Sequence, residues 1–220
     1  MSRRSLSISG GVRRRGFTTV FRAVGVAAAV LAATVLGATP ASAATFNVNY
    51  PVTGESVVAK TGSTLELGPG TLSTTVTTRT GGADLTGTLQ LPPSQASFSV
   101  AGFIPVRATV TIIPTGPVTG TLVQGVVNAH AEAYIQLSNI WVAGVFYTPV
   151  GKECRTEQPV SIDMVSESNF TVFNGGTVSG TYTIPDFDNC TIFSWLLSSL
   201  VSGPDNTISL DLGRPVTPTT

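Results

Sequence analysis

The stretch Val106-Arg107-Ala108-Thr109-Val110-Thr111-Ile112 decides the fold class of this chain. Apolar residues alternate here with arginine and threonine, so every second side chain falls on the same side of an extended backbone. A period of two with β-branched residues and threonine is typical of a half-buried strand. The stretch therefore predicts a β-strand with one face in a core and the other in water.

The same alternation recurs along the chain, at Phe46–Tyr50, Leu85–Leu91, Val178–Ile184 and Ile208–Leu212. Turn-forming glycine, proline and asparagine residues separate these segments, at Gly68-Pro69-Gly70, Gly81-Gly82, Pro92-Pro93, Gly116-Pro117 and Asn174-Gly175-Gly176. At this density of turn signals we expect about ten to twelve short strands. The pattern predicts an all-β fold, an antiparallel β-sandwich as first choice and a β-barrel as second choice.

One segment near the C-terminus has a different period. Between Thr191 and Ser202, apolar residues recur at three- and four-residue steps, and Gly203-Pro204 follows as a stop signal. This spacing predicts one short helix that packs on the sheet beside Cys190.

A short motif is repeated in three predicted strands. Leu85-Thr86-Gly87-Thr88-Leu89, Val118-Thr119-Gly120-Thr121-Leu122 and Val178-Ser179-Gly180-Thr181-Tyr182 share a central glycine. Glycine inside a strand marks a bulge or a close approach of another backbone. We expect one of these two features at Gly87, Gly120 and Gly180.

The N-terminus has the three zones of a secretory signal. Six arginines and no acid lie in residues 1–22, an uncharged Ala/Val/Leu run covers residues 23–38, and Thr39-Pro40-Ala41-Ser42-Ala43 supplies an A-x-A cleavage site. We expect a signal peptide over residues 1–43, with export by the general secretory or the twin-arginine route. A single β domain over 44–212 and a disordered Pro/Thr tail over 213–220 are expected to follow.

Removal of the signal changes the charge of the protein. The whole chain has 12 basic and 12 acidic residues, and six of the basic ones lie in the signal, so the remainder is acidic. An acidic chain without a basic face is not expected to bind nucleic acid. In an exported protein the default state of two cysteines is a bridge, so we expect a Cys154–Cys190 disulfide, for which the loop-entropy model gives about 3–4 kcal/mol.

Several strings resemble one group of proteins. Leu85–Pro93, the neighbourhoods of the two cysteines including Thr181–Cys190, and the closing Gly203–Leu210 look like a group of small exported proteins of actinobacteria. The resemblance implies export and a cell-envelope setting. It brings no activity with it.

Few residues suggest chemistry. His130 is the single histidine, and in a strand it shares a face with Glu132 as a candidate acid–base pair, although a solvated polar strand face is the favoured interpretation. The acid pairs Glu153/Glu157 and Asp186/Asp188 flank the cysteines and are candidates for glycoside hydrolysis, against solvated loop charges as the favoured interpretation. Asp186, Asp188 and Asn189 offer three oxygen ligands in one turn, a candidate calcium site.

The sequence therefore favours a secreted or envelope-associated protein that is not an enzyme and acts by binding or structure. The alternatives are a membrane-associated β-barrel or oligomeric pore, and a secreted hydrolase. A deep apolar pocket would indicate a small ligand, whereas a filled core with an exposed apolar patch would indicate a protein partner.

Overall fold

The structure is a computed structural model that describes residues 43–100 and 102–216. The predicted signal peptide therefore lies outside the described residues except for Ala43. Strands account for 68% of the structure, which confirms the all-β class. They are β1 (Thr45–Val58), β2 (Ser63–Arg79), β3 (Gly82–Gln90), β4 (Ser94–Val100), β5 (Ile104–Pro114), β6 (Val118–Val123), β7 (Val126–Val142), β8 (Phe146–Thr148), β9 (Arg155–Thr156), β10 (Val160–Ser166), β11 (Gly176–Ile184), β12 (Phe187–Asp188) and β13 (Gly203–Leu212).

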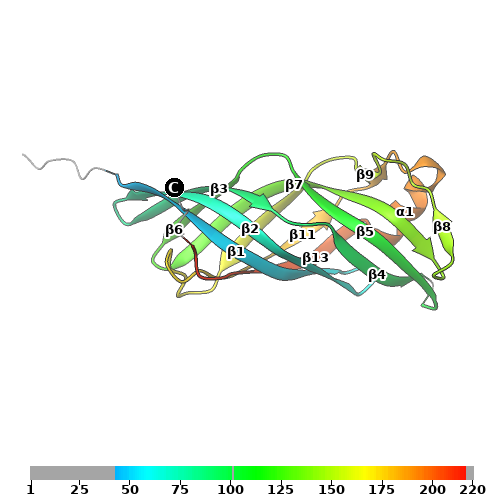
Figure 1. The fold of residues 1–220 in the computed structure, drawn as a ribbon, viewed down its shortest axis with the longest axis horizontal. Helices are drawn as coiled ribbons and strands as arrows, with labels where there is room; N and C mark the ends of the chain where they lie inside the picture. The colour runs from blue at the N-terminus through cyan, green and yellow to red at the C-terminus, as the bar shows by residue number, and fades with distance from the viewer. Residues whose placement is uncertain (1–42, 101, 217–220) are drawn as a thin grey trace, which may run out of the picture. The chain divides into compact units, whose positions relative to one another are not determined.

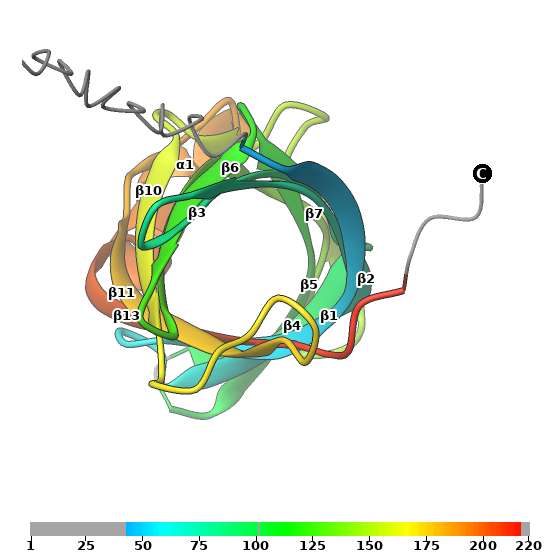
Figure 2. The ribbon, with the colours of Figure 1, turned by 90° about the vertical axis from the view of Figure 1, so that its left-hand side faces the viewer.

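The strands form a closed barrel rather than the two-sheet sandwich expected first. Hydrogen bonds run through β10-β11-β13-β1-β2-β3-β6-β7, and β10 also pairs with β7, which closes a ring of eight antiparallel strands. Figure 2 looks along this ring, and Figure 1 shows it from the side. The second choice, a β-barrel, is the fold observed. Alternation alone does not separate the two folds, because both need strands with one apolar face.

Strand β7, one of two strands with 17 residues, joins the barrel to the remaining elements. One of its edges pairs first with β6 and then with β5, from Val123↔Val126 to Val106↔Val142. Its other edge pairs with β10, and further along with β9 and β8. β4 pairs with β5, and β12 pairs with β9. These additional strands extend the wall of the barrel toward the end where helix α1 lies (Figure 1).

Several strands are longer than the sequence suggests. The signal Gly68-Pro69-Gly70 was expected to separate two strands, but it lies inside β2, which runs for 17 residues. The pairing of β1 with β2 shifts register between Val52 and Gly54, beside this point. A register shift bends a strand and increases its twist without ending it. Glycine and proline here curve the wall instead of forming a turn.

The predicted helix is present. A 3-10 turn at Thr191–Phe193 (η1) leads into α1 (Ser194–Val201), and β13 begins at Gly203. The predicted disulfide is present too, between Cys154 and Cys190, with an S–S distance of 2.02 Å. A disulfide is compatible with an extracellular location.

The start of the predicted disordered tail pairs with a strand. Gly213 N donates to Pro51 O at 2.9 Å, and Val216 N donates to Asn49 O at 2.9 Å. Residues 213–216 therefore lie alongside β1, and the expected start of a disordered tail at Gly213 is wrong. Residues 217–220 lie outside the described part of the chain.

Candidate functional site

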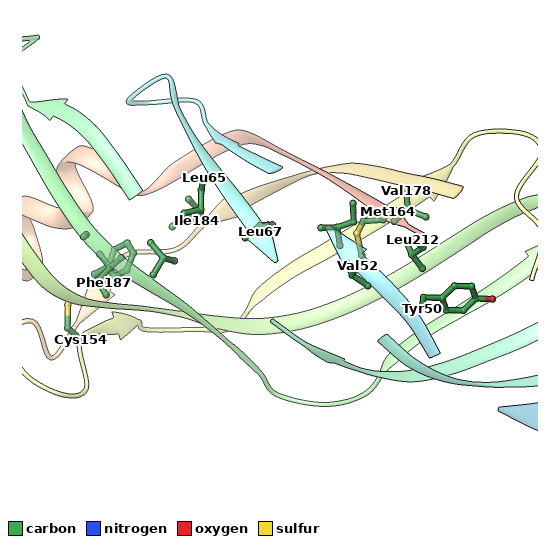
Figure 3. Close-up of a cluster of buried hydrophobic side chains, with 14 of the residues drawn as sticks. Tyr50, Val52, Leu65, Leu67, Cys154, Met164, Val178, Ile184, Phe187 and Leu212 are labelled. Carbon is green, nitrogen blue, oxygen red and sulfur yellow. The ribbon is translucent and has the colours of Figure 1, made fainter. Parts of the chain in front are cut away.

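The apolar residues of the alternating strands point into the barrel. In β5, Val106, Ala108 and Val110 are buried, whereas Arg107 is exposed. Equivalent positions on the other strands add the side chains labelled in Figure 3, among them Val52, Leu67, Met164, Val178 and Leu212. The interior of the barrel is thus an apolar core contributed by every strand of the ring.

This core is not filled. Three apolar cavities, of about 60, 110 and 150 Å³, lie inside the described domain. The 60 and 110 Å³ cavities share four lining residues, Leu89, Val118, Met164 and Leu210. The 110 and 150 Å³ cavities share Phe98, Ile140 and Leu197. The three are therefore neighbours in a row. We call the 60 Å³ cavity the lower cavity, the 110 Å³ cavity the middle cavity and the 150 Å³ cavity the upper cavity. The end of the barrel at which α1 lies is accordingly the upper end.

Small residues leave this space open. Ala96, Ala108, Ala131 and Ala133 line the middle cavity, and Gly87 and Gly120 line the lower one. The expectation of a close backbone approach at the repeated glycine is confirmed. A Cβ atom would collide with the carbonyl oxygen of Ser73 at Gly87, of Asn128 at Gly120 and of Asp163 at Gly180.

The lower cavity contains an unpartnered hydroxyl group. Thr74 is only 6% exposed, and its Oγ1 has no hydrogen-bond partner among the described residues. A buried hydroxyl without a partner costs about 1–3 kcal/mol. Thr74 lines the lower cavity, so a molecule placed there would have a polar group within reach.

The hydroxyl of Tyr182 is a second polar group at the middle cavity. Ser56 Oγ donates to Thr207 O at 2.9 Å and lies 2.6 Å from the Tyr182 hydroxyl. Because serine has one hydroxyl proton, Tyr182 must donate in the Ser56–Tyr182 bond. The oxygen of Tyr182 therefore keeps a free acceptor position. Burial raises the pKa of Tyr182, so the phenol is neutral at ordinary pH.

The loop between β10 and β11 packs at the lower end of the barrel. Phe170 is buried, and its ring centroid lies 6.3 Å from that of Tyr50. The backbone nitrogen of Phe170 donates to Gly125 O at 3.0 Å, and the Tyr50 hydroxyl donates to Val172 O at 2.7 Å. These bonds hold the loop against both β1 and the β6–β7 turn.

Helix α1 closes the upper end. Leu197 is buried and lines both the middle and the upper cavities. The Cys154–Cys190 bridge ties the start of the helical segment to the chain before β9. Ser198 Oγ accepts from Phe187 N at 2.8 Å, and Ser202 Oγ donates to Pro185 O at 2.8 Å. The helix is thus anchored at its start, middle and end.

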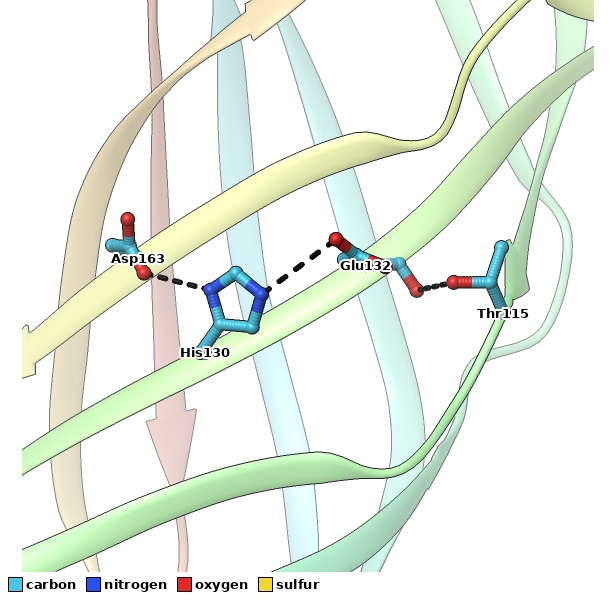
Figure 4. A network of polar contacts seen from close by, with 4 residues as sticks. All are labelled: Thr115, His130, Glu132 and Asp163. Carbon is cyan, nitrogen blue, oxygen red and sulfur yellow. Dashed lines mark hydrogen bonds and ion pairs between the residues drawn. The ribbon is translucent and has the colours of Figure 1, made fainter.

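His130 lies on the outer surface. Its Nδ1 is 2.8 Å from Asp163 Oδ1, and its Nε2 is 3.9 Å from Glu132 Oε1 (Figure 4). The side chains of His130, Glu132 and Asp163 are 45%, 53% and 83% exposed. The hydrogen bond of His130 goes to a carboxylate and not to a serine or threonine hydroxyl. The trio therefore has the geometry of a solvated cross-strand charge cluster, and Asp163 is the member that the sequence did not reveal.

The acid pairs flanking the cysteines come together in part. Glu157 N donates to Asp186 O at 2.8 Å, because β9 pairs with β12. Glu157, Asp186 and Asp188 border one open surface hollow beside the exposed Trp195, whereas Glu153 does not border it. The hydrolytic role of these acids stays a prediction.

The candidate calcium ligands are exposed. Asp188 Oδ1 accepts from Asn189 N at 2.6 Å, so the carboxylate caps its own turn. Asp186 and Asp188 lie on either side of the buried Phe187. Among the described residues, no three His, Cys, Asp or Glu side chains group closely enough to hold a metal ion. The calcium site, which includes an asparagine, stays a prediction.

Exposed apolar side chains gather near the upper end. Phe103 lies in the β4–β5 turn, and Phe146 lies at the start of β8. The β7–β8 turn is held to β5, because Ala143 N donates to Pro105 O at 2.8 Å. Trp141 and Tyr147 have ring centroids 5.3 Å apart beside them. Within the described ranges, no helix is both long and apolar enough to cross a membrane.

The chain matches no family model, and searches of curated proteins and of solved structures find no significant similarity. Its function is therefore argued from its own geometry.

Proposed function

We propose that the domain is an exported, non-enzymatic binding protein that holds a neutral, elongated, mainly apolar molecule inside its barrel. The observation that carries the proposal is the row of three apolar cavities with the unpartnered hydroxyl of Thr74 in the lower one. Protein interiors contain few voids larger than a water molecule. An apolar cavity of roughly 150 Å³ suffices to bind benzene, so the row has space for a slender ligand.

The lining defines the chemical class of this ligand. The cavities are bordered by aliphatic and aromatic side chains, with hydroxyl groups at Thr74 and Tyr182. The one charged residue among the lining residues of the three cavities is Glu132, and its carboxylate lies on the outer surface beside His130. An anionic head group would find no cation there, and burial of an unpaired charge is costly. We therefore favour a neutral lipophile with a hydroxyl or carbonyl group, such as a long-chain alcohol or a terpenoid alcohol, over a free fatty acid.

The polarity of the wall supports binding over a pore. Outward positions of the ring strands are mainly threonine, serine and charged residues, as in β3, where Asp84, Thr86 and Thr88 are exposed. A barrel that faces lipid carries the opposite pattern, with an apolar outer band and a polar interior. The outer surface of this barrel is therefore suited to water.

The experiment measures binding of a neutral apolar fluorophore, N-phenyl-1-naphthylamine, to the oxidised protein secreted from cells. We expect enhanced, blue-shifted fluorescence that dodecanol reverses at lower concentration than dodecanoate. Ala131→Phe places a phenyl ring in the middle cavity and should weaken binding at least tenfold. Thr86→Phe adds the same ring to the outer surface and should bind like wild type.

Two results would contradict the proposal. One is the absence of any fluorescence change with wild-type protein. The other is equal binding by wild type and by a folded Ala131→Phe variant, because the fluorophore would then sit on the surface. Stronger displacement by dodecanoate would overturn the assignment of a neutral ligand.

A further inference from the structure

The wall of the barrel is interrupted between two pairs of strands. Pairing of β3 with β6 ends at Gly87↔Val118, and pairing of β4 with β5 ends at Ser94↔Val110. Between these points, residues 88–93 and 111–117 are not paired with each other. We call this unpaired interval the side opening.

The sequence explains why the two segments do not pair. Pro92 and Pro93 have no backbone N–H to donate to a neighbouring strand. On the other side, Thr115 is occupied by β7, since its backbone nitrogen and its hydroxyl both donate to Glu132 O, at 3.0 and 3.2 Å. Gly116 and Pro117 then form a corner at which β5 ends and β6 begins.

The side opening leads to the middle cavity. Residues from both of its borders line that cavity, namely Leu89 and Leu91 on one side and Ile112, Pro114, Gly116 and Val118 on the other. Pro114 and Gly116 are also exposed to solvent. The same residues therefore face the interior space and the outside of the molecule.

Each end of the barrel carries a fixed segment. At the lower end the loop with Phe170 is hydrogen-bonded to β1 and to the β6–β7 turn, and at the upper end lies α1, tethered by the disulfide. We infer that the ligand enters and leaves the barrel through the side opening at Gly116. This inference rests on the proposed function and adds the route to it.

Gly116 offers a direct test of the route. A Cβ atom at this position would meet no heavy atom within 4 Å, and the φ angle of Gly116 is not in the left-handed region. Gly116→Trp therefore places an indole over the opening without backbone strain. We expect the association and dissociation rate constants of N-phenyl-1-naphthylamine, measured by stopped flow, to fall together by about tenfold or more. An obstacle at the opening slows entry and exit alike, so the Kd should change by less than either rate constant.

Three further variants complete the test. Gly116→Leu should slow both rates to a smaller extent, and it replaces Gly116→Trp if the larger residue impairs folding. Thr86→Trp adds an indole elsewhere on the outer surface and should leave the rates unchanged. Ile192→Trp adds one at the upper end, where Ile192 is exposed and lines none of the three cavities, and should also leave the rates unchanged.

The outcomes separate the route from the function. Wild-type rates in both folded Gly116 variants would overturn the side opening while the proposed function stands. Slow exchange in Ile192→Trp together with normal exchange in Gly116→Trp would place the route at the helix end instead. A wild-type protein that does not bind the fluorophore would overturn the proposed function itself.

Discussion

At the scale of single residues, the barrel is notable for neutral polar groups held in an apolar interior. Tyr50 is 3% exposed, and burial raises the pKa of its phenol to about 12. Its hydroxyl donates to Val172 O and so fastens the loop that carries Phe170. The phenol can donate this bond only while it is protonated.

This shift predicts a loss of stability at alkaline pH. The pKa of Tyr50 is near 10 in the unfolded chain and higher in the folded one, so above pH 10 the unfolded state loses its proton first. The stabilisation that comes from this pKa difference is fully present below pH 10 and is lost as the pH rises through 12. For two pKa units the loss is up to about 2.7 kcal/mol. Urea unfolding at pH 8 to 11 measures it. Tyr50→Phe should be about 1 kcal/mol less stable at pH 8, for one lost hydrogen bond, and its stability should fall less steeply. Parallel curves for the two proteins would show that folding does not raise the pKa of Tyr50.

The sequence alone does not reveal which residues the polar side chains contact. Alternation places His130 and Glu132 on one face of a strand, and the structure agrees. The contact with Asp163 depends on the pairing of β7 with β10, in which His130 lies opposite Asp163. Thr74 carries no signal of its own, because the sequence contains many alternating threonines that face water.

At the scale of elements, α1 acts as the cover of the upper end. Leu197 inserts between the middle and upper cavities, whereas Trp195 in the same helix is 71% exposed. A buried leucine replaced by alanine costs about 2–5 kcal/mol, and an exposed side chain usually less than about 0.5 kcal/mol. We therefore predict a clear loss of unfolding free energy in Leu197→Ala and almost none in Trp195→Ala, measured by urea titration of the oxidised protein. Equal losses would mean that α1 does not pack as a cover.

Local elements were predicted well because their signals are local. The helix follows from three- and four-residue spacing, and the disulfide from the number of cysteines and the expected export. Turn signals were less reliable. Gly81-Gly82 does join two strands, whereas Gly68-Pro69-Gly70 bends one. The two cases differ in which distant strand lies alongside, and a single sequence does not carry that information.

At the scale of the whole molecule, closure of the sheet determines what the protein can do. The pairing of β10 with β7 joins segments whose alternation is the same in a sandwich. Closure turns the two faces of one sheet into an inside and an outside, and small residues on the inward face then leave space. Neither closure nor the cavity follows from the sequence, since both depend on how the inward side chains of eight strands add together.

A ligand bound in that space should stabilise the entire barrel. A molecule that binds only the folded state adds about 2.7 kcal/mol at a free concentration of 100 times its Kd. For a domain of this size, this corresponds to a rise in Tm of about 5–10 °C. Differential scanning calorimetry with increasing dodecanol should show this rise in wild type and in Thr86→Phe. Ala131→Phe should show little of it, because the phenyl ring occupies the middle cavity. An alcohol bound to the surface would raise the Tm of all three proteins alike. A decrease in Tm would show that the alcohol prefers the unfolded chain. Only a rise in Tm that disappears when the cavity is filled locates the ligand inside the barrel.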